Sequence, residues 1–106
     1  MALVLQSIDS NGIATLTLND EGNLNAMSDE MAKEFSAIIA GLKANASLRA
    51  VILTGAGKAF SAGGHLSMLE AKRTKSAEEN KRGMLAFYSS FLCIQELKVP
   101  VIAALN

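Results

Sequence analysis

Cysteine, histidine and proline each occur only once in this chain of 106 residues, and tryptophan is absent. Because Cys93 is the only cysteine, no disulfide can form within the chain. Because His65 is the only histidine, a histidine-rich zinc site and a catalytic triad built on any other histidine are both excluded. No spacing of metal ligands is visible either, so we expect no metal site.

A net charge of one sign is also missing, because ten Lys and Arg residues balance ten Asp and Glu residues. The composition therefore gives no electrostatic reason to expect nucleic acid or an anionic membrane as a partner. Basic residues gather between Lys72 and Arg82, but Glu78 and Glu79 lie among them. We interpret this stretch as the solvated face of a helix.

Long apolar runs are absent as well: none approaches the roughly 20 residues that a membrane-spanning helix needs. Residues 1–5 lack the basic start and the long apolar segment of a signal peptide. We therefore expect a cytoplasmic protein in a reducing compartment. Half of the residues are hydrophobic, which disfavours disorder, and we expect one folded unit over residues 1–106 with no internal domain boundary.

Periodicity and turn residues predict alternating strands and helices. Asp9-Ser10-Asn11-Gly12 is typical of a hairpin turn, and Ser28 is a favourable N-cap for a helix that ends near residues 43–45. Apolar residues at helical spacing predict one buried stripe on that helix (Met31, Phe35, Ile38, Ile39, Leu42) and a second apolar side on a later helix (Met84, Phe87, Tyr88, Phe91, Ile94, Leu97). We interpret the aromatics of this second side as core or subunit contact rather than as part of a cofactor site. The expected strands are Leu3–Ile8, Ile13–Leu18, Arg49–Thr54 and a buried Val101–Leu105, and the expected later helices are Leu66–Glu70 and Ala77–Leu97. This order describes an α/β chain.

The glycine-rich stretch Gly55–Gly64, directly after the apolar run Ala50–Thr54, is the strongest functional signal. Small residues and four glycines leave backbone N–H groups open to a ligand oxygen, which suits phosphates or a developing oxyanion. A nucleotide site is the less favoured alternative. Gly55-x-Gly57 lacks the spacing of a dinucleotide fingerprint, and Lys58 is not followed by Ser or Thr as in a phosphate-binding loop.

Three segments in the same order resemble the enoyl-CoA hydratase/isomerase (crotonase) superfamily. The stretch Ala50–Leu66 is similar to the signature of that family. Upstream, Leu18-Asn19 and Asn25-Ala26-Met27 are similar to its Leu-Asn…Asn-Ala-Leu segment. Downstream, Lys98–Asn106 is similar to its Lys-Pro-Val-Ile-Ala-Ala-Val-Asn strand. Together these matches cover nearly the whole chain.

The resemblance implies a crotonase-like spiral of ββα units, of which this chain is an incomplete, N-terminal portion. It also implies an acyl-CoA thioester as substrate, with coenzyme A as part of that substrate and no separate cofactor. Gly64 matches a backbone N–H donor of the family's oxyanion hole, although on its own it would be read as an ordinary turn glycine. Ala62, Gly63 and Leu66 match positions that border the adenine and pantetheine of CoA, and Ala26 matches another wall of the adenine pocket.

The chain departs from the family pattern near the signature. His65 stands where the family usually has aspartate, and it either caps the following helical turn or acts as a general base. The upstream loop Asp20–Asn23 lacks a positive charge that often lies near the CoA phosphates, for which Lys58 or the group Lys72–Lys75 would have to compensate. We expect Glu70 to be an exposed helix residue rather than an acid or base.

In the family, the second oxyanion donor and the pair of catalytic glutamates follow the position of Asn106. The resemblance therefore implies that these 106 residues alone do not catalyse hydration, because adding water needs a positioned acid and base. It also implies that the acyl chain and the reaction type are determined mostly beyond this segment. The alternative is a non-catalytic acyl-CoA binding or interaction fragment. The resemblance also implies homo-oligomers (trimers or hexamers) for complete members, and we expect the isolated segment to self-associate or to be unstable.

Overall fold

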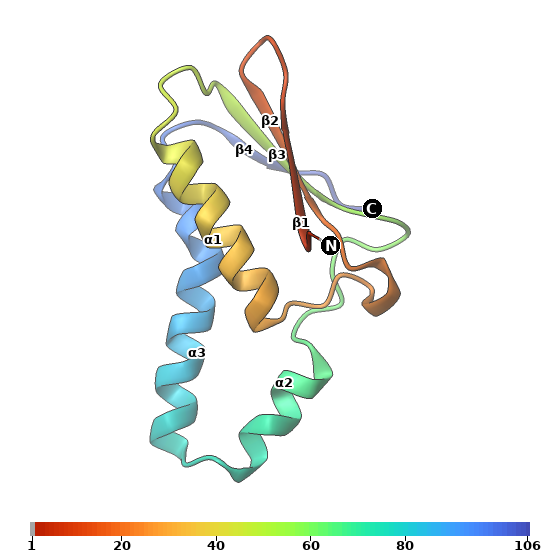
Figure 1. Cartoon of the computed structure of the whole chain (residues 1–106), viewed down its shortest axis with the longest axis vertical. Helices are drawn as coiled ribbons and strands as arrows, with labels where there is room; N and C mark the ends of the chain where they lie inside the picture. Colours follow the sequence, from red (N-terminus) through yellow and green to blue (C-terminus); the bar gives the residue numbers. More distant parts are fainter. Residues whose placement is uncertain (1) are drawn as a thin grey trace.

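The computed structural model describes residues 2–106 as a mixed α/β chain in which a small sheet is flanked by helices (Figure 1). The α/β class agrees with the order of elements expected from the sequence. The strands are β1 (Val4–Ile8), β2 (Ile13–Leu18), β3 (Ala50–Gly55) and β4 (Val101–Ala103), and the helices are α1 (Asp29–Lys43), α2 (Leu66–Ala71) and α3 (Ala77–Leu92). Short 3₁₀ turns cover Glu21–Asn23, Lys72–Thr74 and Cys93–Glu96.

The four strands form one sheet in the order β1-β2-β3-β4. β1 and β2 are antiparallel and are joined by the predicted hairpin, in which Gly12 adopts a φ of +82° that a residue with a side chain rarely takes. β2 pairs parallel with β3, and β3 pairs parallel with β4. Parallel neighbours require crossovers, which α1 provides for the first pair and α2 with α3 for the second.

The core lies between the sheet and α1. Ser28 caps α1 as predicted, since its Oγ accepts a hydrogen bond from the backbone N–H of Met31 at 3.2 Å. The apolar stripe of α1 is buried except for the half-buried Ile38, and it packs on alternate side chains of β2. The buried residues of this layer are Val4, Ala14, Leu16, Leu18, Met31, Phe35, Ile39, Leu42, Leu48 and Val51.

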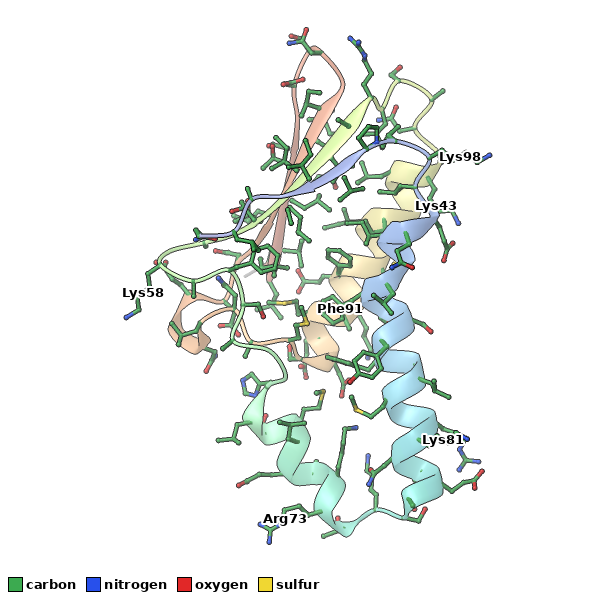
Figure 2. All side chains as sticks on the ribbon, turned by 180° about the vertical axis from the view of Figure 1, so that it is seen from behind. Lys43, Lys58, Arg73, Lys81, Phe91 and Lys98 are labelled. Atoms are coloured by element: carbon green, nitrogen blue, oxygen red, sulfur yellow. The ribbon has the colours of Figure 1, made fainter. Side chains whose placement is uncertain are left out.

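α3 packs on α1 through its inner apolar stripe. The rings of Phe35 and Phe91 lie 5.3 Å apart, and Phe91 contacts Phe87 edge to face at 5.2 Å. Figure 2 shows Phe91 in this position between the two helices. Of these aromatics, Tyr88 does not belong to the core of this chain, because its side chain is 54% exposed. A subunit contact for Tyr88 stays a prediction. Tyr88 lies about 100° around the helix from Phe87, and α1 covers only the Phe87 side.

Two boundaries and one burial state also differ from the sequence-based expectation. The predicted helix over Ala77–Leu97 is α-helical only to Leu92 and continues as the 3₁₀ turn Cys93–Glu96. The predicted strand over Val101–Leu105 is regular only to Ala103. Its expected burial was wrong: every residue of β4 is exposed, because among the described elements only β3 makes extensive contact with it and no helix covers its faces.

α2 and the N-terminal half of α3 extend away from the sheet and diverge from α1 (Figure 1). Across residues 2–106, no helix combines the length and the apolar composition that crossing a membrane requires.

Candidate functional site

The glycine-rich segment begins where β2 and β3 end together. Leu18 pairs with Gly55 at the carboxyl ends of the two parallel strands, and the Ala56 N–H donates to the Leu18 carbonyl at 2.8 Å. From there the chain turns back toward the segment that precedes α1. The carboxyl edge of a parallel sheet is the usual place for a ligand site in α/β folds, so the sequence signal lies where such a site is expected.

Two segments that are distant in sequence run side by side at this edge. The Ala62 N–H donates to the Leu24 carbonyl at 2.9 Å, the Met27 N–H donates to the Gly63 carbonyl at 2.6 Å, and the His65 N–H donates to the Met27 carbonyl at 2.8 Å. This pairing brings Ala26, which is buried, next to the segment that holds Ala62, Gly63 and Gly64. Leu66 follows as the first residue of α2, and its side chain is 70% exposed.

The N–H group of Gly64 is not used in this pairing. In a parallel bridge one residue exchanges hydrogen bonds with the two residues that flank its partner, so the partner's own N–H points away. Here Met27 bonds to Gly63 and His65, and among the described residues nothing accepts a hydrogen bond from Gly64. Gly64 is exposed, and the side chains of Met68 and Leu69 border it.

Gly63 gives the segment the bend that precedes this N–H group. Its φ of +97° lies in the region that favours glycine, and its own N–H donates to Ser61 Oγ at 3.1 Å. The Gly63 N–H therefore has an acceptor within the protein, whereas the Gly64 N–H has none among the described residues.

Asn25 is a residue whose role the sequence analysis did not recognise. Its side chain is fully buried and donates through Nδ2 to the carbonyls of Ala56 at 2.9 Å and Ala59 at 2.8 Å. Its Oδ1 accepts from the Asp20 N–H at 2.7 Å. The available signal was its place in the Asn25-Ala26-Met27 motif. Its φ of +55° is a second feature that asparagine tolerates better than most residues.

His65 is the N-cap of α2, which agrees with the capping alternative. Its Nδ1 accepts a hydrogen bond from the Ser67 N–H at 3.3 Å and lies 2.8 Å from Ser67 Oγ. Glu70 is exposed on α2 as expected, and residues 56–66 contain no Asp or Glu. The segment around the Gly64 N–H therefore contributes hydrogen-bond donors and apolar surface, without a carboxylate of its own.

The cationic side chains do not converge on Gly64. Lys58 is exposed at the tip of the glycine-rich turn and points outward, and Arg73 lies at the far end of α2 (Figure 2). The ion pair between Lys43 Nζ and Glu96 Oε1, at 2.6 Å, borders a separate surface hollow of about 340 Å³. Within residues 2–106 no group of three or more His, Cys, Asp or Glu side chains is arranged to hold a metal ion.

The comparisons with known proteins agree on one family. The family model described as enoyl-CoA hydratase/isomerase matches residues 9–106. A "probable enoyl-CoA hydratase" of Mycobacterium tuberculosis is 39% identical over 103 residues, which is 97% of this chain and 39% of the relative. A short-chain-enoyl-CoA hydratase of Clostridium acetobutylicum is 38% identical over 95 residues, which is 89% of this chain and 35% of the relative.

Among solved structures, an enoyl-CoA hydratase of Mycobacterium smegmatis superimposes with a TM-score of 0.83 at 36% identity. The match covers 97% of this chain and 39% of that structure. The chain thus spans between 35% and 39% of the length of these three proteins, and it corresponds to the N-terminal portion of their fold.

Proposed function

The chain belongs to the enoyl-CoA hydratase/isomerase family, and from that premise we propose that it forms the part of an acyl-CoA enzyme that binds the thioester carbonyl. The Gly64 N–H is the proposed donor to the thioester oxygen. The observation that carries the proposal is that this N–H is exposed and without an acceptor in the described residues, while the N–H groups of Ala62, Gly63 and His65 are all engaged.

Chemistry on an acyl-CoA moves negative charge onto the thioester oxygen. When a base removes a proton from the α-carbon, the C–H electron pair forms a carbon–carbon double bond, and the carbonyl oxygen becomes an enolate oxyanion. Adding water to an enoyl-CoA places charge on the same oxygen. A backbone donor fixed before the reaction stabilises this charge, and such a donor lowers the barrier by about 3–4 kcal/mol.

The remaining predicted residues are proposed to border coenzyme A, which is part of the substrate. Ala62 and Gly63 precede the donor in the same segment, Ala26 lies on the paired segment, and Leu66 offers an exposed apolar side chain beside them. Small residues at three of these positions leave room for a flat adenine or an extended pantetheine to approach the backbone. No further cofactor is part of the proposal.

We also propose that the 106-residue chain by itself binds acyl-CoA without hydrating it. Hydration needs an acid and a base within hydrogen-bond reach of the reacting carbons, and residues 56–66 offer no carboxylate for that role. The family relationship supports hydratase or isomerase chemistry, and assembly into a trimer or hexamer, for a complete protein of this type.

The test compares Gly64→Pro with Gly64→Ala. Proline removes the N–H, and the preceding residue is glycine, which limits the steric restriction before proline. Alanine keeps the N–H, and its Cβ would lie in ordinary contact with Met68 and Leu69, at 3.6 Å. Calorimetric titration with butyryl-CoA and with free CoA measures the contribution of the whole butyryl thioester, and comparing the proline with the alanine variant isolates the part that needs the Gly64 N–H.

We expect the unmodified chain and Gly64→Ala to bind butyryl-CoA more tightly than CoA, and Gly64→Pro to lose that preference. A difference of about 1.5–3 kcal/mol, or at least tenfold in affinity, corresponds to a hydrogen bond to a polarised oxygen. If Gly64→Pro kept the full preference, Gly64 would not be the donor. If the unmodified chain turned over crotonyl-CoA, the proposed lack of hydration would be wrong.

A further inference from the structure

Asn25 is the only buried polar side chain in the described part of the chain, and every hydrogen-bonding atom of its carboxamide has a partner. Its Nδ2 group bonds the carbonyls of Ala56 and Ala59, and its Oδ1 bonds the Asp20 N–H. One side chain thus joins the loop before α1 to the glycine-rich turn, over more than 30 residues of sequence. A buried amide with all partners present fixes the relative position of the segments it joins.

Ser61 extends this connection toward Gly64. Its hydroxyl donates to the Asn25 main-chain carbonyl at 2.8 Å and accepts from the Gly63 N–H at 3.1 Å. The hydroxyl is therefore used both as donor and as acceptor. Asn25, which bonds to Ala56 and Ala59, is therefore also linked through Ser61 to the Gly63 N–H. That N–H belongs to the peptide group directly before the one that carries the Gly64 N–H.

We infer that Asn25, acting through Ser61, is the positioning residue for the Gly64 N–H. The pair supplies the acceptor for the Gly63 N–H, while the Leu24 and Met27 carbonyls accept from Ala62 and His65, so the Gly64 N–H is the one left for a ligand. Without the hydroxyl, the Gly63 N–H would lose its acceptor and become a second, competing donor beside Gly64. The expected effect on binding of a thioester oxygen rests on the proposed function. The positioning of the Gly64 N–H itself is a property of the unliganded chain.

Ser61→Ala is the principal test, with Ser61→Thr as the conservative variant that keeps the hydroxyl. Ser36→Ala is the matched control, because Ser36 Oγ also donates to a backbone carbonyl, that of Lys33, at 3.2 Å. Amide hydrogen exchange and ¹H–¹⁵N spectra of the full chain report on Gly63 and Gly64 without any ligand. Thermal unfolding of each variant shows how much of the effect is a general loss of stability.

In Ser61→Ala we expect the Gly63 amide to exchange about fivefold faster, the factor for one net hydrogen bond, and the Gly64 signal to move. The preference for butyryl-CoA over CoA should fall by about the same factor. Ser61→Thr should restore both. If Gly63 and Gly64 in Ser61→Ala behaved as in Ser36→Ala, the inference would be overturned.

A second pair of variants tests Asn25 itself. Asn25→Asp and Asn106→Asp make the same chemical change. Each asparagine donates twice to carbonyls of the glycine-rich turn, since Asn106 Nδ2 bonds Gly55 at 2.9 Å and Gly57 at 2.7 Å. Only Asn25 is linked to Gly63 through Ser61. We expect faster exchange at Gly63 in Asn25→Asp but not in Asn106→Asp, and equal effects would contradict the inference.

The two proposals fail separately. If the unmodified chain bound butyryl-CoA and CoA equally, the proposed function would fail, while the exchange measurements would still decide whether Asn25 and Ser61 position the Gly64 N–H. If Asn25→Asp did not fold, Ser61→Ala would carry the test, because Ser61 is only half-buried and contributes no apolar packing.

Discussion

Two regions of the molecule differ in how their structure is held. The body consists of β1–β3 and α1, and the arm consists of residues 66–92, which include α2 and α3. The body contains most of the buried apolar side chains, whereas Phe87 is the only buried residue of the arm. The arm instead exposes large apolar side chains at Leu66, Leu69, Leu85, Tyr88 and Leu92.

The difference shows that the two regions depend on different interactions. Burial of apolar area, at about 25 cal/mol per Å², stabilises the body. In the arm, the second half of α3 packs on α1 through Phe87 and Phe91. α2 and the start of α3 depend instead on their caps: His65 begins α2, and Ser76 with Glu79 forms a complete capping box at the start of α3. A region with few buried contacts opens at a lower free energy than the core. Gly64 lies at the junction, with the body on one side and α2 on the other.

The largest expected contrast is between Phe35→Ala in the body and Tyr88→Ala in the arm. Phe35 is 2% exposed and Tyr88 is 54% exposed. We expect Phe35→Ala to lower the free energy of unfolding by about 3–5 kcal/mol, because it leaves a cavity against Phe91. Tyr88→Ala should cost about 1 kcal/mol or less, mainly its edge contact with Phe87. Urea denaturation followed by circular dichroism measures both, and similar losses would show that the arm has a core of its own.

The second contrast concerns self-association. Leu85, Tyr88 and Leu92 form a second apolar stripe on α3 that α1 does not cover, and such a surface favours association between copies. The double variant Leu85→Lys with Leu92→Lys should raise the dissociation constant of any self-association at least tenfold, since each buried leucine contributes about 1.5–3 kcal/mol.

Sedimentation velocity over a range of concentrations measures this effect. The matched control is Leu5→Lys with Ile8→Lys, which changes two exposed apolar residues of β1 that lie on opposite faces of the strand. A monodisperse monomer at every concentration would contradict the expected association. An equal effect of both double variants would place the contact elsewhere than on α3.

The same two regions show which structural features could be predicted from the sequence alone. The α1 helix was predicted nearly to its ends because its cap and its apolar stripe are local in sequence. The hairpin was predicted for the same reason, through Asn11-Gly12. The burial of β4 was wrongly predicted, and the sequence did not show which aromatics of α3 belong to the core, because burial depends on which other segments cover a surface and periodicity does not contain that information.

The sequence predicted which segment forms the candidate site, but not how the backbone groups of that segment are arranged. The glycine-rich stretch pointed to backbone donors, and the structure brings it beside Ala26 and Met27. The Gly64 N–H is left without an acceptor because Gly64 forms a bridge with Met27, which is 37 residues away in the sequence. The role of Asn25 likewise depends on bonds across 31 and 34 residues. Interactions over such separations leave no periodic trace in a single sequence.

The smallest expected effect concerns the capping box of the arm. The Ser76 N–H donates to the Glu79 carboxylate at 3.2 Å, and the Ser76 hydroxyl accepts from the Glu79 N–H at 3.1 Å. The hydrogen bonds with the backbone and side chain of Ser76, together with the positive charge of Lys75, lower the pKa of Glu79 below its ordinary value of 4.5. A carboxyl whose pKa is lower in the folded than in the unfolded chain adds stability above its unfolded pKa. That stability is lost as the pH falls through the folded pKa.

We therefore expect exchange of the first-turn amides of α3 to become faster below about pH 4.5, relative to the intrinsic rate, while the buried amides of α1 stay protected. Glu79→Gln should remove this pH dependence, because its amide does not titrate in that range. Glu78→Gln is the control in the same turn, since Glu78 makes no side-chain bond to Ser76. Equal pH dependence in the unmodified chain, Glu79→Gln and Glu78→Gln would mean that the start of α3 opens for a reason other than the loss of its capping box. The capping box would then not be what stabilises this end of the arm.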